Sequence, residues 1–167
     1  ASATLSFTLG LDSLFDAYEF RFMNMHPASS NQPFGFQVNA AGASGFNEVM
    51  TTTAFQAWHT ENNSGAALGY ETGIDQAQGT AYQVLTTGVG NDNDSAASGI
   101  LTLYAPSSTT YVKHFTSRLQ ASSSVGSVEK YIAGYINVTA AIDEISFKFS
   151  SGNIDAGVIK MYGIAKA

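Results

Sequence analysis

Residues 18–26 read Y-E-F-R-F-M-N-M-H, and this stretch decides the fold class. Its aromatic residues recur at every second position, so they share one face of an extended chain. That face consists of Tyr18, Phe20 and Phe22, and the opposite face consists of Glu19, Arg21, Met23 and Met25. The period of two predicts a β-strand. Pro27 ends it, because proline has no N–H group to donate to a neighbouring strand.

Short runs of the same kind recur along the chain. They are residues 5–9, 34–38, 100–104, 111–119, 131–138, 142–149 and 157–162. Gly, Ser, Asn or Pro separate them at intervals of roughly 10–15 residues, a spacing typical of antiparallel sandwiches and barrels. A length of 167 residues suits one domain. We therefore expect a single all-β domain over residues 1–167, an antiparallel β-sandwich with jelly-roll-like connections.

The middle of the chain, residues 43–98, is harder to interpret. Residues 49–58 fit either a strand or a short helix, and residues 67–70 and 82–87 fit strands. Residues 91–95 read N-D-N-D-S, a composition that predicts a turn-rich loop. This loop offers oxygen ligands but lacks the glycine and the final acidic residue of a calcium-binding EF-hand loop, so we interpret it as a solvated turn.

The composition argues against a nucleic-acid partner. Charged residues make up only 12% of the chain, and short neutral polar residues take their place. Such surfaces are typical of β-rich proteins that pack against neighbours, because burying a neutral polar group costs less than burying a charge. The net charge is −6 with only seven Lys and Arg. This balance predicts no nucleic-acid partner, because phosphate binding needs basic side chains.

The chain contains no cysteine, which excludes disulfides, thiolate nucleophiles and zinc–sulfur sites. No run approaches the roughly 18 apolar residues of a membrane-spanning helix, and no signal-peptide pattern opens the sequence. Ala1 is small enough to follow a removed initiator methionine. We therefore expect an intact gene product with no membrane partner.

No motif in the sequence indicates catalysis. There is no Gly-x-Ser-x-Gly elbow and no glycine-rich phosphate loop. The three histidines, His26, His59 and His114, lie too far apart in sequence to form a local metal pair. Asp143 and Glu144 are the only adjacent acidic pair. Neighbouring residues of a strand point to opposite faces, so these two carboxylates would not share a substrate. We expect no catalytic residue, no cofactor and no metal, and we interpret the chain as a non-enzyme.

Trp58 is the single candidate for a ligand-binding residue. Sugar-binding proteins stack their ligands on exposed aromatic rings, and Trp58 lies beside His59 in the ambiguous middle of the chain. Core packing is the alternative interpretation, and it applies to the phenylalanines that alternate with polar residues.

Two stretches carry a resemblance to a known class of protein. They are residues 17–28, A-Y-E-F-R-F-M-N-M-H-P-A, and residues 142–164, I-D-E-I-S-F-K-F-S-S-G-N-I-D-A-G-V-I-K-M-Y-G-I. Together they resemble small virion proteins of tailed bacteriophages, in which an early Tyr-x-Phe-x-Phe strand leads to a Pro-containing turn and the chain ends in a hairpin. The resemblance implies that residues 142–149 and 157–162 pair as an antiparallel hairpin around the turn at residues 151–153.

The same resemblance implies a virion structural protein with a β-sandwich fold. The short chain has no fibrous shaft, which favours a head decoration (cement) protein that binds the major capsid protein and copies of itself, with a homotrimer as the expected assembly. A tail fibre or a receptor- or glycan-binding domain is the main alternative. A hydrolase built on a β-sandwich is the third hypothesis.

Overall fold

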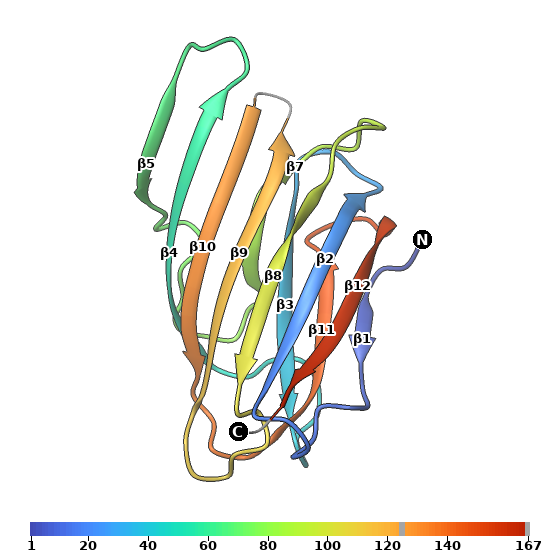
Figure 1. Cartoon of the computed structure of the whole chain (residues 1–167), viewed down its shortest axis with the longest axis vertical. Coiled ribbons are helices and arrows are strands. Elements are labelled where there is room, and N and C mark those ends of the chain that lie inside the picture. The colour runs from blue at the N-terminus through green and yellow to red at the C-terminus, as the bar shows by residue number, and fades with distance from the viewer. Residues whose placement is uncertain (124–125, 166–167) are drawn as a thin grey trace.

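Two antiparallel sheets pack face to face in the computed structural model, which describes residues 1–123 and 126–165 (Figure 1). The small sheet has the order β1 (Leu5–Phe7), β11 (Ile142–Phe149), β3 (Gln32–Ala40) and β7 (Gln83–Val89). The large sheet has the order β12 (Ile154–Ile164), β2 (Ala17–Pro27), β8 (Ala97–Tyr104), β9 (Lys113–Ser123), β10 (Gly126–Ile136), β4 (Met50–Thr60) and β5 (Ala66–Tyr70), with β6 (Ala77–Gly79) paired to β4. The described residues form no helix, and the predicted antiparallel β-sandwich is confirmed. The jelly-roll-like connectivity stays a prediction.

Phenylalanine rings from both sheets fill the core between them. Phe147 of β11 lies at the centre of this cluster, fully buried. Its ring centroid lies between 5.2 and 6.5 Å from those of five other phenylalanines. These are Phe7, Phe20, Phe22, Phe34 and Phe36. Two of these pairs, those with Phe7 and Phe22, meet edge to face, a favourable arrangement for the ring quadrupoles.

The alternation predicted for residues 18–26 is confirmed up to Phe22 and is wrong for Met25. Tyr18, Phe20 and Phe22 are buried in the core as expected. Met25, expected on the outer face, is also completely buried. The cause is a β-bulge between Phe22 and Met25, where Asn24 adopts a left-handed φ of 51°. The bulge inserts residues into the strand and so turns the following side chains to the other face.

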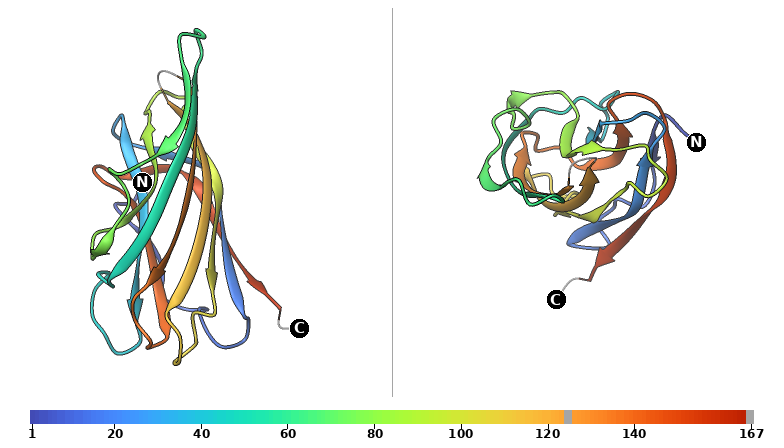
Figure 2. Two further views of the ribbon diagram at one scale, coloured as in Figure 1. Left: turned by 90° about the vertical axis from the view of Figure 1, so that its left-hand side faces the viewer. Right: turned by 90° about the horizontal axis from the view of Figure 1, so that it is seen from above.

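The C-terminal hairpin implied by the resemblance is wrong. β11 pairs with β1 and β3 in the small sheet, whereas β12 pairs with β2 in the large sheet. The turn after β11 therefore crosses from one layer to the other (Figure 2). Both strands present an apolar face, and each buries it against the shared core from its own side. The predicted strand alternations in residues 142–149 and 157–162 are nevertheless confirmed.

The ambiguous middle of the chain forms strands. Of residues 49–58, all but the first belong to β4, which excludes the short helix, and the other two expected strands correspond to β5 and β7. β4 and β5 form a hairpin that extends beyond the neighbouring strands at one end of the molecule (Figures 1 and 2). The predicted turn at residues 91–95 is present, and the Ser95 N–H donates to the Asp92 carbonyl at 2.9 Å.

Buried amide side chains fix the crossover between β5 and β7. Gln83 is fully buried, and its Oε1 accepts hydrogen bonds from Thr52 Oγ1 at 2.8 Å and from Gln76 Nε2 at 3.2 Å. Its Nε2 donates to the Ile74 carbonyl at 2.9 Å. This network connects the β4–β5 hairpin to β7, so it sets the position of the two walls of the cleft described below.

The loop before β2 is anchored by a hydrogen bond between Tyr18 and Asp12. The Tyr18 hydroxyl donates to Asp12 Oδ1 at 2.6 Å, and the Asp12 N–H donates to the same hydroxyl at 3.1 Å. The hydrogen bond from Tyr18, together with one from the Leu14 N–H, lowers the pKa of Asp12 below its usual value of 3.8.

We expect Tyr18→Phe to raise the pKa of Asp12 toward its usual value, because the largest source of stabilisation of the carboxylate is lost. In the wild-type protein this carboxylate stabilises the fold above its unfolded pKa, and the contribution disappears as the pH falls through the lowered folded pKa. An NMR titration of the Asp12 side-chain carbon measures the change. Tyr162→Phe is the matched control, and an Asp12 pKa that is equal in both variants contradicts the assignment.

Candidate functional site

The outer face of the large sheet carries a row of large side chains that crosses seven strands. We define the outer face as the side chains of this sheet that point away from the small sheet. Strand register brings them together from β12 to β5. The row consists of Lys160, Arg21, Ile100, Arg118, Tyr131, Phe55 and Tyr70. Its positive residues lie toward β12, and its aromatic residues lie toward β5.

Rings and cations within this row contact one another. The rings of Phe55 and Tyr131 stack with centroids 4.7 Å apart and planes only 5° from parallel. The guanidinium of Arg118 lies 5.4 Å from the centroid of Tyr131, and it also forms an ion pair with Glu129. Phe55 and Tyr131 therefore face each other across the two strands, with the cation of Arg118 beside Tyr131.

The second arginine of the row is arranged in the same way. Arg21 lies 5.0 Å from the ring centroid of Tyr162 and pairs with Glu19 at 2.6 Å. Both arginines thus combine an aromatic neighbour with a carboxylate, so their charge is largely balanced on the surface itself. The outer face is consequently rich in apolar and aromatic area but low in net charge.

Two shallow hollows lie on either side of the Phe55–Tyr131 stack. One, of about 380 Å³, is lined by Ala133, Gly134, His114 and Tyr135 among others. The other, of about 460 Å³, is lined by Ala57, Ala66 and one side of Trp58, among others. Small residues alternate with large ones along β4 and β10, so the stack forms a ridge between two depressions.

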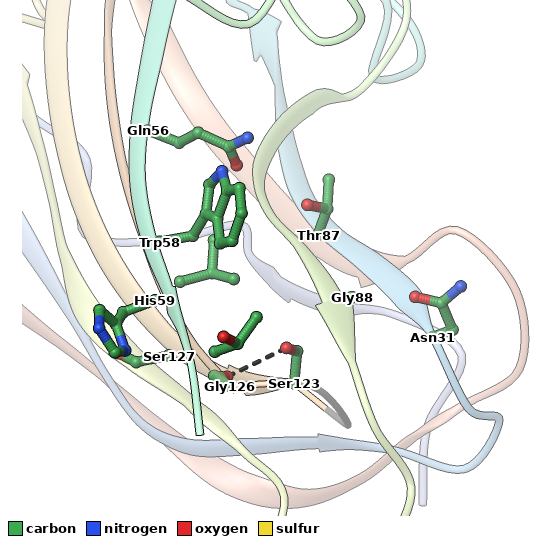
Figure 3. Close-up of a pocket in the computed structure, with 11 residues that line it drawn as sticks. Asn31, Gln56, Trp58, His59, Thr87, Gly88, Ser123, Gly126 and Ser127 are labelled. Carbon is green, nitrogen blue, oxygen red and sulfur yellow. Dashed lines mark hydrogen bonds between the residues drawn. The ribbon is translucent and has the colours of Figure 1, made fainter. Parts of the chain in front are cut away.

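A second candidate site is the inter-sheet cleft, a cavity of about 250 Å³ between the β4–β10 end of the large sheet and β7. Figure 3 shows Trp58 and Gln56 on β4 opposite Thr87 on β7, with Asn31 beyond Gly88. Ser123 and Gly126 close one end of the cleft, and the Ser123 hydroxyl donates to the Gly126 carbonyl at 3.0 Å. Trp58 is half-buried and is not part of the core cluster.

Side chains on both sides of Trp58 hold its surroundings in place. The Gln56 Oε1 accepts a hydrogen bond from the buried Lys130 Nζ at 2.6 Å, and the Gln56 Nε2 donates to Glu71 Oε1 at 2.6 Å. Lys130 also pairs with Glu71 Oε2 at 3.2 Å. On the hairpin side, a Cβ atom placed on Gly65 would lie only 3.1 Å from the Trp58 ring. The absence of a side chain at residue 65 therefore lets the turn close against the indole.

The histidines lie apart from one another in the structure. His26 lies at the end of β2 as expected, with its Nδ1 2.7 Å from the Ser95 carbonyl oxygen. His59 and His114 are exposed on the outer face, and the ring of His114 is 6.4 Å from that of Tyr135. Glu144 accepts a hydrogen bond from Asn39 Nδ2 at 3.2 Å. Over residues 1–123 and 126–165, no group of three or more His, Asp or Glu residues is placed to hold a metal ion.

Sequence reasoning identified Trp58 but missed the outer face. The row depends on which residues lie opposite one another across strands, and this register is not visible in a single strand. One signal was present, because Phe55, Tyr131 and Tyr135 occupy the positions that alternate with core residues in β4 and β10. Large aromatic residues at solvent-facing positions are unusual for a sheet that faces water, and they point to a contact surface.

Comparison with protein-family models, curated proteins and solved structures finds no match to this chain. No helix in the described parts of the chain is long and apolar enough to cross a membrane. The class of protein is therefore defined by the geometry alone: an antiparallel β-sandwich with an aromatic outer face and a tryptophan-lined cleft.

Proposed function

We propose that this chain is a structural protein of a tailed-bacteriophage virion, a head decoration protein that binds the shell of major capsid protein through its outer face. The observation that carries the proposal is the array of exposed aromatic and aliphatic side chains on the large sheet. Phe55 is 46% exposed, Tyr104 and Tyr162 are each 42% exposed, and Leu68 is 73% exposed. Apolar patches of this kind on soluble proteins mark interaction surfaces.

The chemistry of the outer face supports a protein partner. Tyr and Arg are enriched where proteins contact one another, and isolated charges are depleted there. Arg21 and Arg118 already have carboxylate partners, so covering them does not leave a lone charge buried. The ridge formed by Phe55 and Tyr131, with a hollow on either side, offers the relief that a complementary surface needs.

The resemblance in sequence of residues 17–28 and 142–164 to phage virion proteins supports the choice of partner, although the two C-terminal strands lie in different sheets and form no hairpin. Both stretches contribute to the outer face, since β2 supplies Glu19 and Arg21 and β12 supplies Lys160 and Tyr162. A trimer of the chain on the shell remains the expected assembly, because local three-fold axes of a capsid place three copies side by side.

The test is decoration of undecorated shells assembled from the major capsid protein of the phage that encodes the chain. We expect the double variant Phe55→Ser/Tyr131→Ser to bind at least about thirtyfold more weakly than the wild type, because truncating a central aromatic contact costs roughly 2 kcal/mol or more. Sedimentation of the shells with densitometry of the bound protein measures the affinity.

Tyr111→Ser is the matched control, since Tyr111 is 73% exposed but lies in the loop between β8 and β9. Thermal melts of all variants confirm that they are folded. Equal binding by the double variant and the control would exclude the outer face as the contact surface. Failure of the wild type to bind shells would refute the decoration role.

The tail location is the alternative, and the copy number in purified virions separates it from the head. A copy number close to that of the capsid subunits supports a decoration protein. A few copies per particle support a tail fibre or receptor-binding domain, and quantitative mass spectrometry of whole virions provides the ratio.

A further inference from the structure

We propose that the inter-sheet cleft is a binding site for a neutral saccharide, with the indole of Trp58 as the surface on which one sugar ring stacks. This inference goes beyond the virion role and does not depend on it. The cleft opens between the sheets, whereas the Phe55–Tyr131 ridge lies on the opposite side of the large sheet.

The inward-facing residues of β4 change from fully buried to partly buried where the cleft begins. Its inward-facing residues Met50 and Ala54 are almost completely buried in the core. Further along the same face come Gln56, Trp58 and Thr60, all only partly buried. A tryptophan that served core packing would be covered by apolar side chains. Trp58 instead faces a cavity whose opposite wall consists of polar residues and glycine.

The polar groups opposite Trp58 are available to a ligand. Within the described residues, no hydrogen bond to the protein is made by the two groups on that wall, the Asn31 amide and the Thr87 hydroxyl. Among the same residues, the indole N–H of Trp58 makes none either. A Cβ atom on Gly88 would lie 3.6 Å from Asn31 Oδ1 and 3.8 Å from the Ser123 Cβ, so the glycine leaves the space between them open. Amide and hydroxyl groups around an aromatic ring match the hydroxyl groups and the apolar ring face of a sugar.

The electrostatics of the cleft favour a neutral ligand. Lys130 is the cation beneath it, and its ammonium group is already bonded to Gln56 and Glu71. Glu71 in turn accepts from Gln56, so the three side chains form a closed network. Neither charge is left free to attract a phosphate or a carboxylate, whereas a neutral polyhydroxylated ring needs none.

The cleft is also preorganised and of suitable size. Gly65 packs against the Trp58 ring, and the amide of Gln56 is fixed by two hydrogen bonds, so little ordering is required on binding. Its volume of about 250 Å³ is smaller than that of sites for drug-sized molecules. The space therefore suits one ring of a glycan, with the rest of the chain continuing into solvent.

Trp58 is the only tryptophan in the chain, so its fluorescence and its single indole N–H signal in an NMR spectrum report directly on the cleft. The probes are neutral hexoses, 6-deoxyhexoses, N-acetylhexosamines and their disaccharides, each titrated to millimolar concentration. We expect at least one of them to shift the emission of Trp58 and its indole signal in a saturable manner.

Three variants test the assignment of the contacts. Trp58→Ala should weaken the binding of that sugar at least tenfold, and Trp58→Phe should restore part of it because a ring is still present. Thr87→Val keeps the shape of the side chain and removes its hydroxyl, so binding should weaken several-fold. Tyr111→Ser is the control and should bind like the wild type; isothermal titration calorimetry measures the variants that lack the indole.

Three results would overturn the proposal. The first is the absence of any response of Trp58 to the whole set of neutral sugars. The second is sugar binding that Trp58→Ala and Thr87→Val leave unchanged, since the sugar would then occupy another place. Stronger binding of free nucleosides than of every sugar would assign the stacking surface to a different class of ligand. None of these measurements uses virions or shells, so their failure leaves the decoration proposal to its own test.

Discussion

Phe147→Ala is expected to lower the free energy of unfolding by about 3–5 kcal/mol, the largest effect of any single substitution we consider. The ring of Phe147 is fully buried and contacts phenylalanines from both sheets. Its removal leaves a cavity where the two layers meet. The neighbouring rings cannot fill this cavity, because each is itself held by strand pairing.

Urea denaturation followed by circular dichroism measures this loss. Phe147→Leu, which keeps most of the apolar volume, should lose only about 1–2 kcal/mol. Phe55→Ala is the surface control, since it removes a ring of the same kind from the exposed outer face. A loss for Phe147→Ala no larger than that for Phe55→Ala would contradict the central position of Phe147 in the core.

Lys113→Met is expected to lower the free energy of unfolding by about 2–4 kcal/mol. Lys113 is completely buried, and its ammonium group donates to three backbone carbonyls. These belong to Tyr111 at 3.0 Å, Val138 at 3.1 Å and Thr139 at 2.9 Å. The side chain thereby connects the loop before β9 with the loop after β10. Methionine has a similar shape but no donor, so it leaves the three carbonyl oxygens without this partner.

The pH dependence of stability distinguishes this role from simple packing. Burial lowers the pKa of Lys113 below its usual value of 10.5. Between the lowered folded pKa and the unfolded pKa, the unfolded chain binds more protons, so the contribution of Lys113 to stability rises with pH in that window. Lys113→Met should lack this rise. Lys160→Met, on the exposed outer face, should keep both the rise and the wild-type stability, and a Lys113→Met protein as stable as wild type would refute the assignment.

The sequence alone predicted the strands whose alternation is regular. Residues 142–149 correspond to β11 in both bounds and faces, because each apolar residue in that run contacts the core. Met25 was placed on the wrong face because the bulge at Asn24 depends on a left-handed backbone, which asparagine tolerates but does not require. The pairing partner of β12 could not be predicted from its own residues, because their alternation fits a hairpin with β11 as well as the observed pairing with β2 in the large sheet.

The candidate sites, too, were predictable only where the signal lies within one stretch of sequence. Trp58 stood out because it lies beside His59 in a stretch with no regular alternation of core residues. Thr87 and Asn31 come close to it only through the packing of the small sheet on the large one, so no local pattern could place them opposite the ring. The outer face likewise depends on the register of seven strands, which the tertiary structure sets.

The crossover between β11 and β12 has a consequence for synthesis of the protein in the cell. β1 pairs with β11, so Ser6 and Ser146 form a hydrogen bond across 140 residues of sequence, and β2 obtains its outer neighbour only from β12. While the ribosome is still translating the region after β10, both sheets have an unpaired edge and the phenylalanine core lacks its central ring. The domain therefore acquires its native structure only after residue 164 has emerged, and folding proceeds slowly because so many pairings join distant segments. During that interval the open strand edges of the nascent chain are exposed to pairing with other chains.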